Sequence, residues 1–445
     1  MVDARTADAL VLVPGIMGSE LRDAHNRVVW GMKPGVLFRQ LASRDVLKRL
    51  QLKPGAPDDG IRPSGLIAFP SYLPILDGIE PYTEMTEALR STTLHPDAVL
   101  EFPYDWRRSV ASNATLLEAA AIAHLEGWKR RVRDLPDYDP RGDEPKLTLV
   151  CHSMGGLLAR YFNEVLGHRD ITRRVISLGT PYAGSMKAVR ILARGDILPL
   201  GLLAASVRDA ARTFPGVYDL LPRYPCVQGQ ALAPLTAQVA AEVGADPVLF
   251  ESAAADHRTV IDAARSAGAG ACPIRAVVGV TQPTLVSMRV AGGEATFDER
   301  LDSDVRRGGD GTVGRDHAFP SASTPSYLPQ KHGKLAATPE SVTFVQSVLT
   351  EIVPGAFQGD GIGLRLPDAA SAQTTFEVEI EVDKGPAMAM CRLVDAGTGH
   401  QVDQQATARR DGRWKASLSA PHPGLYRVSA AGGGFSPVED ILLVQ

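Results

Sequence analysis

The sequence predicts a doubly wound α/β domain with a mostly parallel sheet, followed by a small C-terminal all-β sandwich domain. Two observations carry this prediction. Over most of the chain, short apolar runs alternate with helical patterns, which is typical of α/β folds. After about residue 355, the pattern changes to short runs in which apolar and polar residues alternate. We therefore assign residues 1–354 to the α/β domain and residues 355–445 to an immunoglobulin-like sandwich.

Apolar runs bounded by glycine or proline are expected to form the buried strands of the parallel sheet. They cover residues 9–13, 97–102, 147–151, 175–178 and 274–280. A helical face formed by Leu117, Ala121, Trp128 and Val132 lies between the second and third runs. In the second domain, strands are expected at residues 375–382, 388–394, 414–418, 425–429 and 441–444.

Two long stretches interrupt the strand–helix rhythm of the first domain, near residues 30–74 and 186–224. The second contains an apolar segment at residues 197–203. Long excursions inside an α/β domain are usually lids or binding loops. We therefore expect both stretches to be lid insertions. The second stretch has two possible interpretations. It is either an apolar lid that dips into lipid or an ordinary cap over the site.

Composition narrows the class of protein. Lys plus Arg number 47 and Asp plus Glu number 51, which gives a net charge of −4 and no electrostatic footprint for nucleic acid. The four cysteines are widely spaced, so neither a disulfide framework nor a zinc site is expected. The N-terminus lacks the basic and apolar regions of a secretory signal, and we expect a cytoplasmic protein.

The most informative motif is an apolar strand that meets a helix through a turn centred on Ser153. This is the arrangement of a nucleophile elbow, which lifts a serine hydroxyl above the edge of the sheet. The residues two before and two after the serine must be small. Gly155 satisfies the second position, and Cys151 stands where glycine is usual. We interpret Ser153 as the nucleophile and Cys151 as a packing residue.

An oxyanion hole is expected from two backbone N–H groups. One is that of Met154, at the N-terminus of the helix after Ser153. The other should come from the glycine-rich loop after the first strand, where Met17 is the predicted donor and Ile16 the alternative.

Chain order selects the acid and the base, because in this kind of fold the serine is followed by the acid and then by the histidine. Asp310 lies in a glycine-rich loop after the run at 274–280, and Asp316 is a bystander nearby. Of the histidines in the right order, His317 follows Asp310 too closely. His332 precedes a helical pattern and is the predicted general base.

These residues predict a serine acyl-transfer mechanism. Ser153 attacks an ester carbonyl, His332 takes the proton, and Asp310 fixes the imidazole tautomer. No metal or organic cofactor is required for this chemistry.

Several motifs, in this order, resemble the lecithin:cholesterol acyltransferase family of α/β-hydrolases, which includes lysosomal phospholipase A2-like and phospholipid:diacylglycerol acyltransferase-like enzymes. The matching segments are residues 13–19 (VPGIMGS), 102–107 (FPYDWR), 152–156 (HSMGG), 178–185 (LGTPYAGS), 218–222 (YDLLP) and 309–313 (GDGTV). They span about residues 10 to 350, and the C-terminal domain is not covered.

The resemblance implies an α/β-hydrolase fold and a serine O-acyltransferase or phospholipase that acts on glycerolipid esters. It assigns the same triad, with Met17 and Met154 as oxyanion donors. It also implies a substrate site walled by Ile16, Tyr104, Trp106 and Tyr182, with a purely structural role as the alternative for residues 104–107. Cys151 departs from the family's elbow glycine, and the lid disulfide of the extracellular members has no counterpart.

Three functions remain in competition. The leading one is a serine-dependent O-acyltransferase or phospholipase/lipase, whose partner is a lipid or other acyl ester, with room for transient contact with a membrane surface. The second is an esterase or amidase for small or non-lipid substrates. The third is a catalytically dead hydrolase scaffold that serves as a binding module, which the intact serine, aspartate and histidine set disfavours.

Overall fold

The computed structural model describes most of the 445 residues. The described ranges are 5–31, 44–53, 58–67, 82–195, 201–268, 272–301, 307–320, 323, 325–352, 361–367, 369–382, 388–432 and 435–445. Much of the expected insertion at 30–74, part of that at 186–224 and the expected domain boundary at 354/355 lie outside these ranges.

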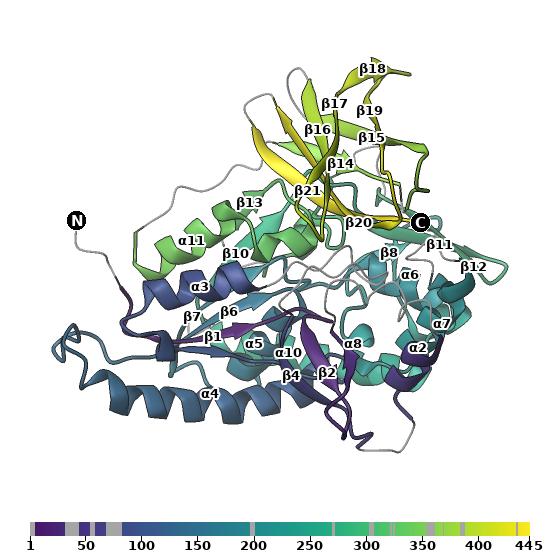
Figure 1. Cartoon of the computed structure of the whole chain (residues 1–445). Helices are drawn as coiled ribbons and strands as arrows, with labels where there is room; N and C mark the ends of the chain where they lie inside the picture. The colour runs from purple at the N-terminus through teal and green to yellow at the C-terminus, as the bar shows by residue number, and fades with distance from the viewer. Residues whose placement is uncertain are drawn as a thin grey trace.

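A sheet of six parallel strands forms the centre of the first domain, in the order β13-β10-β7-β6-β1-β5 (Figure 1). The strands are β1 (Ala9–Val13), β5 (Val99–Glu101), β6 (Leu147–His152), β7 (Thr172–Leu178), β10 (Ile274–Gly279) and β13 (Ser326–Leu328). This confirms the predicted α/β class. The carboxyl ends of parallel strands gather at one edge of the sheet, which is where α/β folds place their sites.

Helices cover both faces of this sheet (Figure 1). On one face lie α4 (Val110–Val132), α5 (Met154–Glu164) and α10 (Pro247–Ala267), and on the other lie α3 (Thr83–Thr92) and α11 (Pro339–Leu349). The alternation along β1 explains the two layers: Val11 and Val13 pack into one apolar cluster, whereas Leu10 and Leu12 pack into another. A strand buried on both faces therefore reads as a continuous apolar run.

The first domain also contains smaller helices and strands. They are β2 (Ser19–Arg22), β3 (Val28–Trp30), α2 (Arg44–Leu50), β4 (Arg62–Leu66), α6 (Met186–Arg194), α7 (Gly201–Ala211), α8 (Pro215–Tyr218), β8 (Pro225–Val227), β9 (Ala233–Pro234), α9 (Ala237–Glu242), β11 (Ser287–Ala291) and β12 (Glu294–Asp298). Short 3-10 helices occur at η1 (Pro96–Ala98), η3 (Arg315–His317) and η4 (His332–Ala336). No helix among the described residues is both long and apolar enough to cross a bilayer.

The C-terminal residues form two four-stranded sheets, as the sequence predicts. One has the order β14-β15-β19-β18 and the other β17-β16-β20-β21. Their strands are β14 (Ile362–Arg365), β15 (Thr375–Val382), β16 (Ala389–Asp395), β17 (Gln401–Ala406), β18 (Ala408–Arg410), β19 (Arg413–Ser419), β20 (Gly424–Gly432) and β21 (Phe435–Val444). Inward-facing residues of both sheets share one apolar core.

The sequence prediction missed several strands, and not all for the same reason. β14 is largely buried but has only four residues, whereas other missed strands have weak apolar patterns. β17 and β18 lie largely exposed at sheet edges, so no alternation marks them. β13 has only three residues. The predicted strand at 97–102 is shorter than expected because Pro96 to Ala98 form a 3-10 turn before β5.

Candidate active site

Ser153 occupies a sharp turn between β6 and α5. Its backbone has φ 52° and ψ −125°, a conformation that non-glycine residues rarely adopt. The turn brings α5 against the first loop so tightly that a Cβ at Gly155 would lie 2.6 Å from the carbonyl oxygens of Val13 and Pro14. Glycine is therefore required at that position, and strain is concentrated at the serine.

Cys151, which replaces the glycine usual in such elbows, is fully buried in the core of the sheet. Burial raises the pKa of its thiol well above the ordinary value, so the group stays protonated and unreactive. The departure from the usual motif is thus accommodated as a small apolar packing residue.

The structure brings Ser153, His332 and Asp310 into one hydrogen-bonded chain. The Nε2 atom of His332 lies 2.8 Å from the Oγ atom of Ser153, and its Nδ1 atom lies 2.7 Å from Oδ2 of Asp310. The serine and the histidine are 179 residues apart in the chain, and the histidine and the aspartate are 22 apart. All three side chains are buried. Ser153 directly follows β6, His332 follows β13, and Asp310 lies between β12 and η3.

Backbone groups hold the aspartate in place. Its Oδ1 atom accepts hydrogen bonds from the N–H groups of Thr312 (2.9 Å) and Val313 (2.7 Å), which leaves Oδ2 directed at the histidine. The N–H group of His332 donates to the carbonyl oxygen of Asp310 at 2.8 Å. The two loops are therefore fastened together by backbone as well as by side chain.

The other candidates of the acid and base loops lie elsewhere. His317 stacks on the ring of Tyr224 with a centroid distance of 3.5 Å, and burial lowers its pKa to about 4. Asp316 pairs with Arg307 at the surface. Neither side chain belongs to the hydrogen-bonded chain at Ser153.

The predicted oxyanion loop packs directly against Ser153. A hydrogen bond from the N–H of Gly18 to the carbonyl of Gly15 closes a β-turn, and Met17 takes the left-handed conformation (φ 66°) that a type II turn needs at its third position. The indole of Trp30 donates to the carbonyl of Met17 at 2.9 Å. A Cβ at Gly15 would lie 2.9 Å from that of Ser153.

Within the part of the chain that the structure describes, the N–H groups of Ile16, Met17 and Met154 have no hydrogen-bond partner. Buried N–H groups without a partner are unusual, and groups of this kind can donate hydrogen bonds to an oxyanion. The choice between Ile16 and Met17 as second donor stays a prediction.

Sequence reasoning missed a hydrogen-bond network behind Ser153. The hydroxyl of Tyr82 accepts from the N–H of Gly15 (2.9 Å) and contacts Nδ1 of His152 at 2.8 Å, and Nε2 of His152 lies 3.0 Å from the carbonyl oxygen of His332. Since a carbonyl can only accept, Nε2 carries the proton and Nδ1 accepts from the tyrosine. A neutral His152 therefore links the oxyanion loop to the histidine loop.

This buried histidine makes stability depend on pH. Burial, and secondarily the nearby His332, lower the pKa of His152 from 6.5 to about 3. Between pH 6.5 and 3, His152 binds a proton in the unfolded chain but not in the folded chain. The free energy of unfolding therefore has its full value above pH 6.5 and decreases as the pH falls toward 3. From neutrality to about pH 5 we expect a loss of about 2 kcal/mol through this group.

Thermal melting of His152→Asn across that range should show a shallower decline than that of the wild type. The exposed His25 provides the control, since His25→Asn should retain the wild-type slope. Parallel slopes for wild type and His152→Asn would contradict this assignment.

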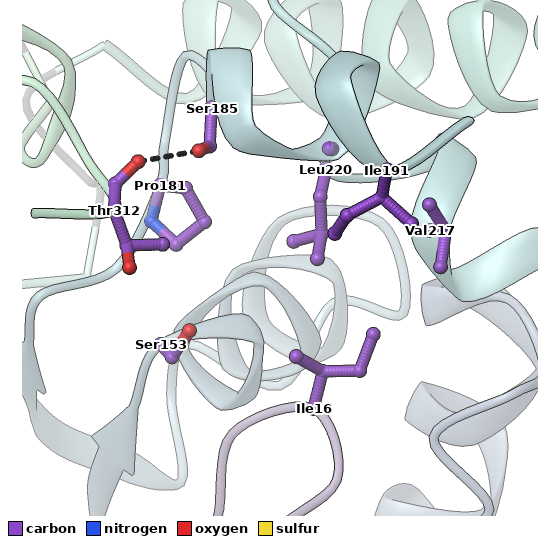
Figure 2. A pocket seen from close by; sticks show the side chains of 9 residues that line it. Ile16, Ser153, Pro181, Ser185, Ile191, Val217, Leu220 and Thr312 are labelled. Atoms are coloured by element: carbon purple, nitrogen blue, oxygen red, sulfur yellow. Dashed lines mark hydrogen bonds between the residues drawn. The ribbon is translucent and has the colours of Figure 1, made fainter. Parts of the chain in front are cut away.

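An apolar pocket opens beside Ser153 (Figure 2). The empty space within it, counted together with the open solvent at its mouth, is about 330 Å³. It is lined by Ile16, Ser153, Pro181, Ser185, Ala188, Ile191, Val217, Leu220 and Thr312. The hydroxyl of Ser185 donates to the carbonyl of Thr312, as the dashed line in Figure 2 marks, so the pocket wall offers mainly hydrocarbon.

Of the predicted substrate-binding residues, Ile16 lines this pocket, whereas Tyr104, Trp106 and Tyr182 do not. The hydroxyl of Tyr104 donates to the carbonyl of Pro14 at 2.9 Å, and the indole of Trp106 donates to that of Ser19 at 3.3 Å. These two aromatic side chains support the backbone of the first loop from behind.

Tyr182 is also buried away from the pocket, with the guanidinium of Arg160 lying 5.6 Å from the centre of its ring. Its neighbour Pro181 reaches the pocket instead. The segments 186–194 and 217–220, which supply most of the apolar wall, belong to the stretch that the sequence marked as an insertion.

A buried ion network accounts for the charged half of the 102–107 motif. The side chain of Arg107 is fully buried, and it pairs with Asp105 at 2.8 Å and with Asp59 at 2.6 Å. It also donates to the carbonyl of Leu50 at 3.0 Å. This arginine therefore fastens α2 and the segment before β4 to the core, which is a structural task.

The chain shares sequence or fold with several known proteins. The family model described as lecithin:cholesterol acyltransferase matches residues 42–285, which include Ser153 but neither Asp310 nor His332. No curated protein matches the chain.

Among solved structures, the Tle4-Tli4 complex is 17% identical, with 78% of this chain and 99% of that chain covered and a TM-score of 0.51, which supports the fold alone. The propeptide form of the Bacillus licheniformis lipase BlEst2 is 12% identical over 99% of this chain and 93% of that chain, with a TM-score of 0.37. The phospholipase PlaB of Legionella pneumophila is 10% identical over 98% and 89%, with a TM-score of 0.31.

Proposed function

The chain belongs to the lecithin:cholesterol acyltransferase family, and we propose that it is a serine-dependent lipase, phospholipase or O-acyltransferase that cleaves lipid acyl esters. The observation that carries the proposal is the hydrogen-bonded chain from Ser153 through His332 to Asp310, at the mouth of an apolar pocket. Nucleophile, base and orienting acid at these distances are the parts that acyl transfer needs.

In the first half of the reaction, the Oγ atom of Ser153 attacks the ester carbonyl while Nε2 of His332 takes its proton. A bond forms between Oγ and the acyl carbon, and the ester C–O bond breaks. The leaving alkoxide receives the proton from His332. The carboxylate of Asp310 accepts a hydrogen bond from the Nδ1–H group of His332 and stabilises the imidazolium that forms.

Negative charge develops on the carbonyl oxygen during this attack. The unpartnered N–H groups of Met154 and of the turn at Ile16 and Met17 are the donors that would stabilise it. The N-terminus of α5 adds its partial positive charge at the same place.

In the second half, a hydroxyl group attacks the acyl-enzyme and His332 again moves the proton. Water as acceptor gives a free acid, and a lipid hydroxyl gives a new ester. The outcome depends on how well water is excluded from the closed site.

The pocket supports an acyl chain as the group that binds beside Ser153. Apart from its serine and threonine groups, its lining consists of hydrocarbon side chains, including Ile16, Ile191 and Leu220. Each methylene buried there contributes about 0.8 kcal/mol. Longer acyl chains are therefore expected to react with higher kcat/KM until the pocket is filled.

A series of p-nitrophenyl esters of increasing chain length tests this proposal. From acetate to medium-length chains, we expect kcat/KM to rise by up to about fourfold for each methylene that is buried. Leu220→Trp, which fills the pocket, should reduce activity on the longer esters by about tenfold and spare acetate. Leu116→Trp on the exposed face of α4 is the control.

A preference for acetate in the wild type would instead favour a small-molecule esterase. Mass spectrometry of a lipid extract incubated with the enzyme then identifies donor and product. Free fatty acid indicates hydrolysis, and a new ester indicates transfer.

A further inference from the structure

We propose that the C-terminal β domain holds the acid and base loops of the site in register, and that Gln282 is the positioning residue through which it acts on Asp310. The inference rests on the proposed function, because it concerns the same hydrogen-bonded chain. It assigns the second domain a part in catalysis that no motif in its own sequence indicates.

The side-chain amide of Gln282 makes two hydrogen bonds to the edge strand of the second domain, as the backbone of a further strand would. It is fully buried, its Nε2 atom donates to the carbonyl of Ile362 at 2.9 Å, and its Oε1 atom accepts from the N–H of Leu364 at 2.9 Å. β14, to which both partners belong, is an edge strand paired with β15 on its other side. One amide thus satisfies a buried donor and a buried acceptor of the β domain.

The backbone of the same residue holds the acid loop. The N–H of Gln282 donates to the carbonyl of Gly309 at 2.9 Å, and the N–H of Gly309 donates back at 3.0 Å. Asp310 is the next residue. The hydroxyl of Thr284 donates to the carbonyl of Gln282 and accepts from the N–H of Gly311, which secures the far side of the turn.

This junction has little room for adjustment. Thr281, just before Gln282, has a φ of 70°, a left-handed conformation that a β-branched residue adopts only when its surroundings enforce it. A Cβ at Gly363 of β14 would lie 2.5 Å from the carbonyl oxygen of Thr281. A Cβ at Gly279 would lie 2.3 Å from that of Asp310. A shift of β14 would therefore move the acid loop.

The β domain also contacts the loop that carries His332. On one side of His332, the side chain of Gln330 donates to the carbonyl of Pro437, and Lys331 pairs with Asp440 at 3.2 Å. On the other side, Lys334 pairs with Glu439 at 2.8 Å. All three partners lie on β21. One domain thus contacts the loops on both sides of the histidine–aspartate hydrogen bond.

The test separates positioning from stability. In the full-length protein, Gln282→Ala should lower kcat and the rate of Ser153 labelling by a fluorophosphonate by about tenfold or more, with KM changed by less than about twofold. The reason is that a small displacement of an orienting acid costs far more in rate than in ground-state binding. Activity is measured well below the melting temperature of each variant.

Arg365→Ala is the matched control. Arg365 crosses the same junction and pairs with Glu299 at 2.9 Å, but it does not contact the acid turn. We expect this variant to melt earlier while its kcat stays within about twofold of the wild type. Equal losses of kcat in Arg365→Ala and Gln282→Ala would overturn the inference, as would a folded Gln282→Ala variant with wild-type kcat.

A second variant serves if Gln282→Ala does not fold. The double substitution Glu439→Gln and Asp440→Asn removes both ion pairs to the base loop from β21. We expect the labelling rate to fall by about threefold or more, and an unchanged rate would overturn the inference. A wild type that forms no Ser153 adduct would overturn the proposed function, and this inference with it. A labelled wild type with unaffected variants would overturn the inference alone.

Discussion

Ser153→Ala is expected to lower kcat on ester substrates by about six orders of magnitude, to the level left by binding and the oxyanion donors. The substitution removes the atom that forms the acyl bond while leaving the pocket intact. Melting temperature should change little, since the hydroxyl contacts mainly Nε2 of His332. Steady-state kinetics and the mass of the protein after fluorophosphonate treatment measure the effect.

Ser177→Ala is a suitable control for that variant. Ser177 lies on the adjacent strand β7, is buried like Ser153 and pairs in register with Cys151, but it does not line the pocket. Its loss should leave both activity and labelling within about threefold of the wild type. Full activity in Ser153→Ala would exclude an acyl-enzyme on this serine.

Asp310→Asn is expected to lower kcat by about four orders of magnitude with little change of fold. The Oδ1 atom would still accept from the N–H groups of Thr312 and Val313, so the side chain would keep its orientation. Its NH₂ group would then face Nδ1 of His332. That contact forces the imidazole into the tautomer with a proton on Nε2, which cannot accept the proton of Ser153.

The same measurement on Asp316→Asn provides the comparison. Asp316 lies on the same segment and pairs with Arg307 at the surface, so its kcat should stay within about twofold. An Asp310→Asn variant with more than about a tenth of wild-type kcat would show that another group orients His332. Asp310→Ala would then reveal whether any side chain is needed there.

Strong local patterns made the α/β domain predictable. Residues 9–13 and 147–151 are almost purely apolar because the strands they form are buried on both faces. Weak patterns failed in the expected places. The strands β17 and β18 are largely exposed, with Val402 of β17 packed against the apolar core, and β13 has only three residues, which pair with β10.

The site residues also differ in how well the sequence predicts their position. Ser153, Asp310 and His332 could be selected because elbow geometry and chain order are local and sequential properties. Tyr104 and Trp106 of the 102–107 motif and Tyr182 of the 178–185 motif were predicted to line the substrate site, with a purely structural role as the alternative for residues 104–107. In the structure, Tyr104 and Trp106 donate hydrogen bonds to the carbonyl oxygens of Pro14 and Ser19, partners that the sequence pattern does not identify.

The sequence by itself determined the fold class, the strained serine turn and the chemical types of the three residues that meet there. Only the tertiary structure decided which side chains wall the apolar pocket, how His152 joins two loops, and which hydrogen bonds Gln282 makes to the β domain and to the loop of Asp310. The physical reason is range. Backbone conformation and burial periodicity are set by neighbours in the chain, whereas contacts between segments depend on how whole elements pack, which no local pattern encodes.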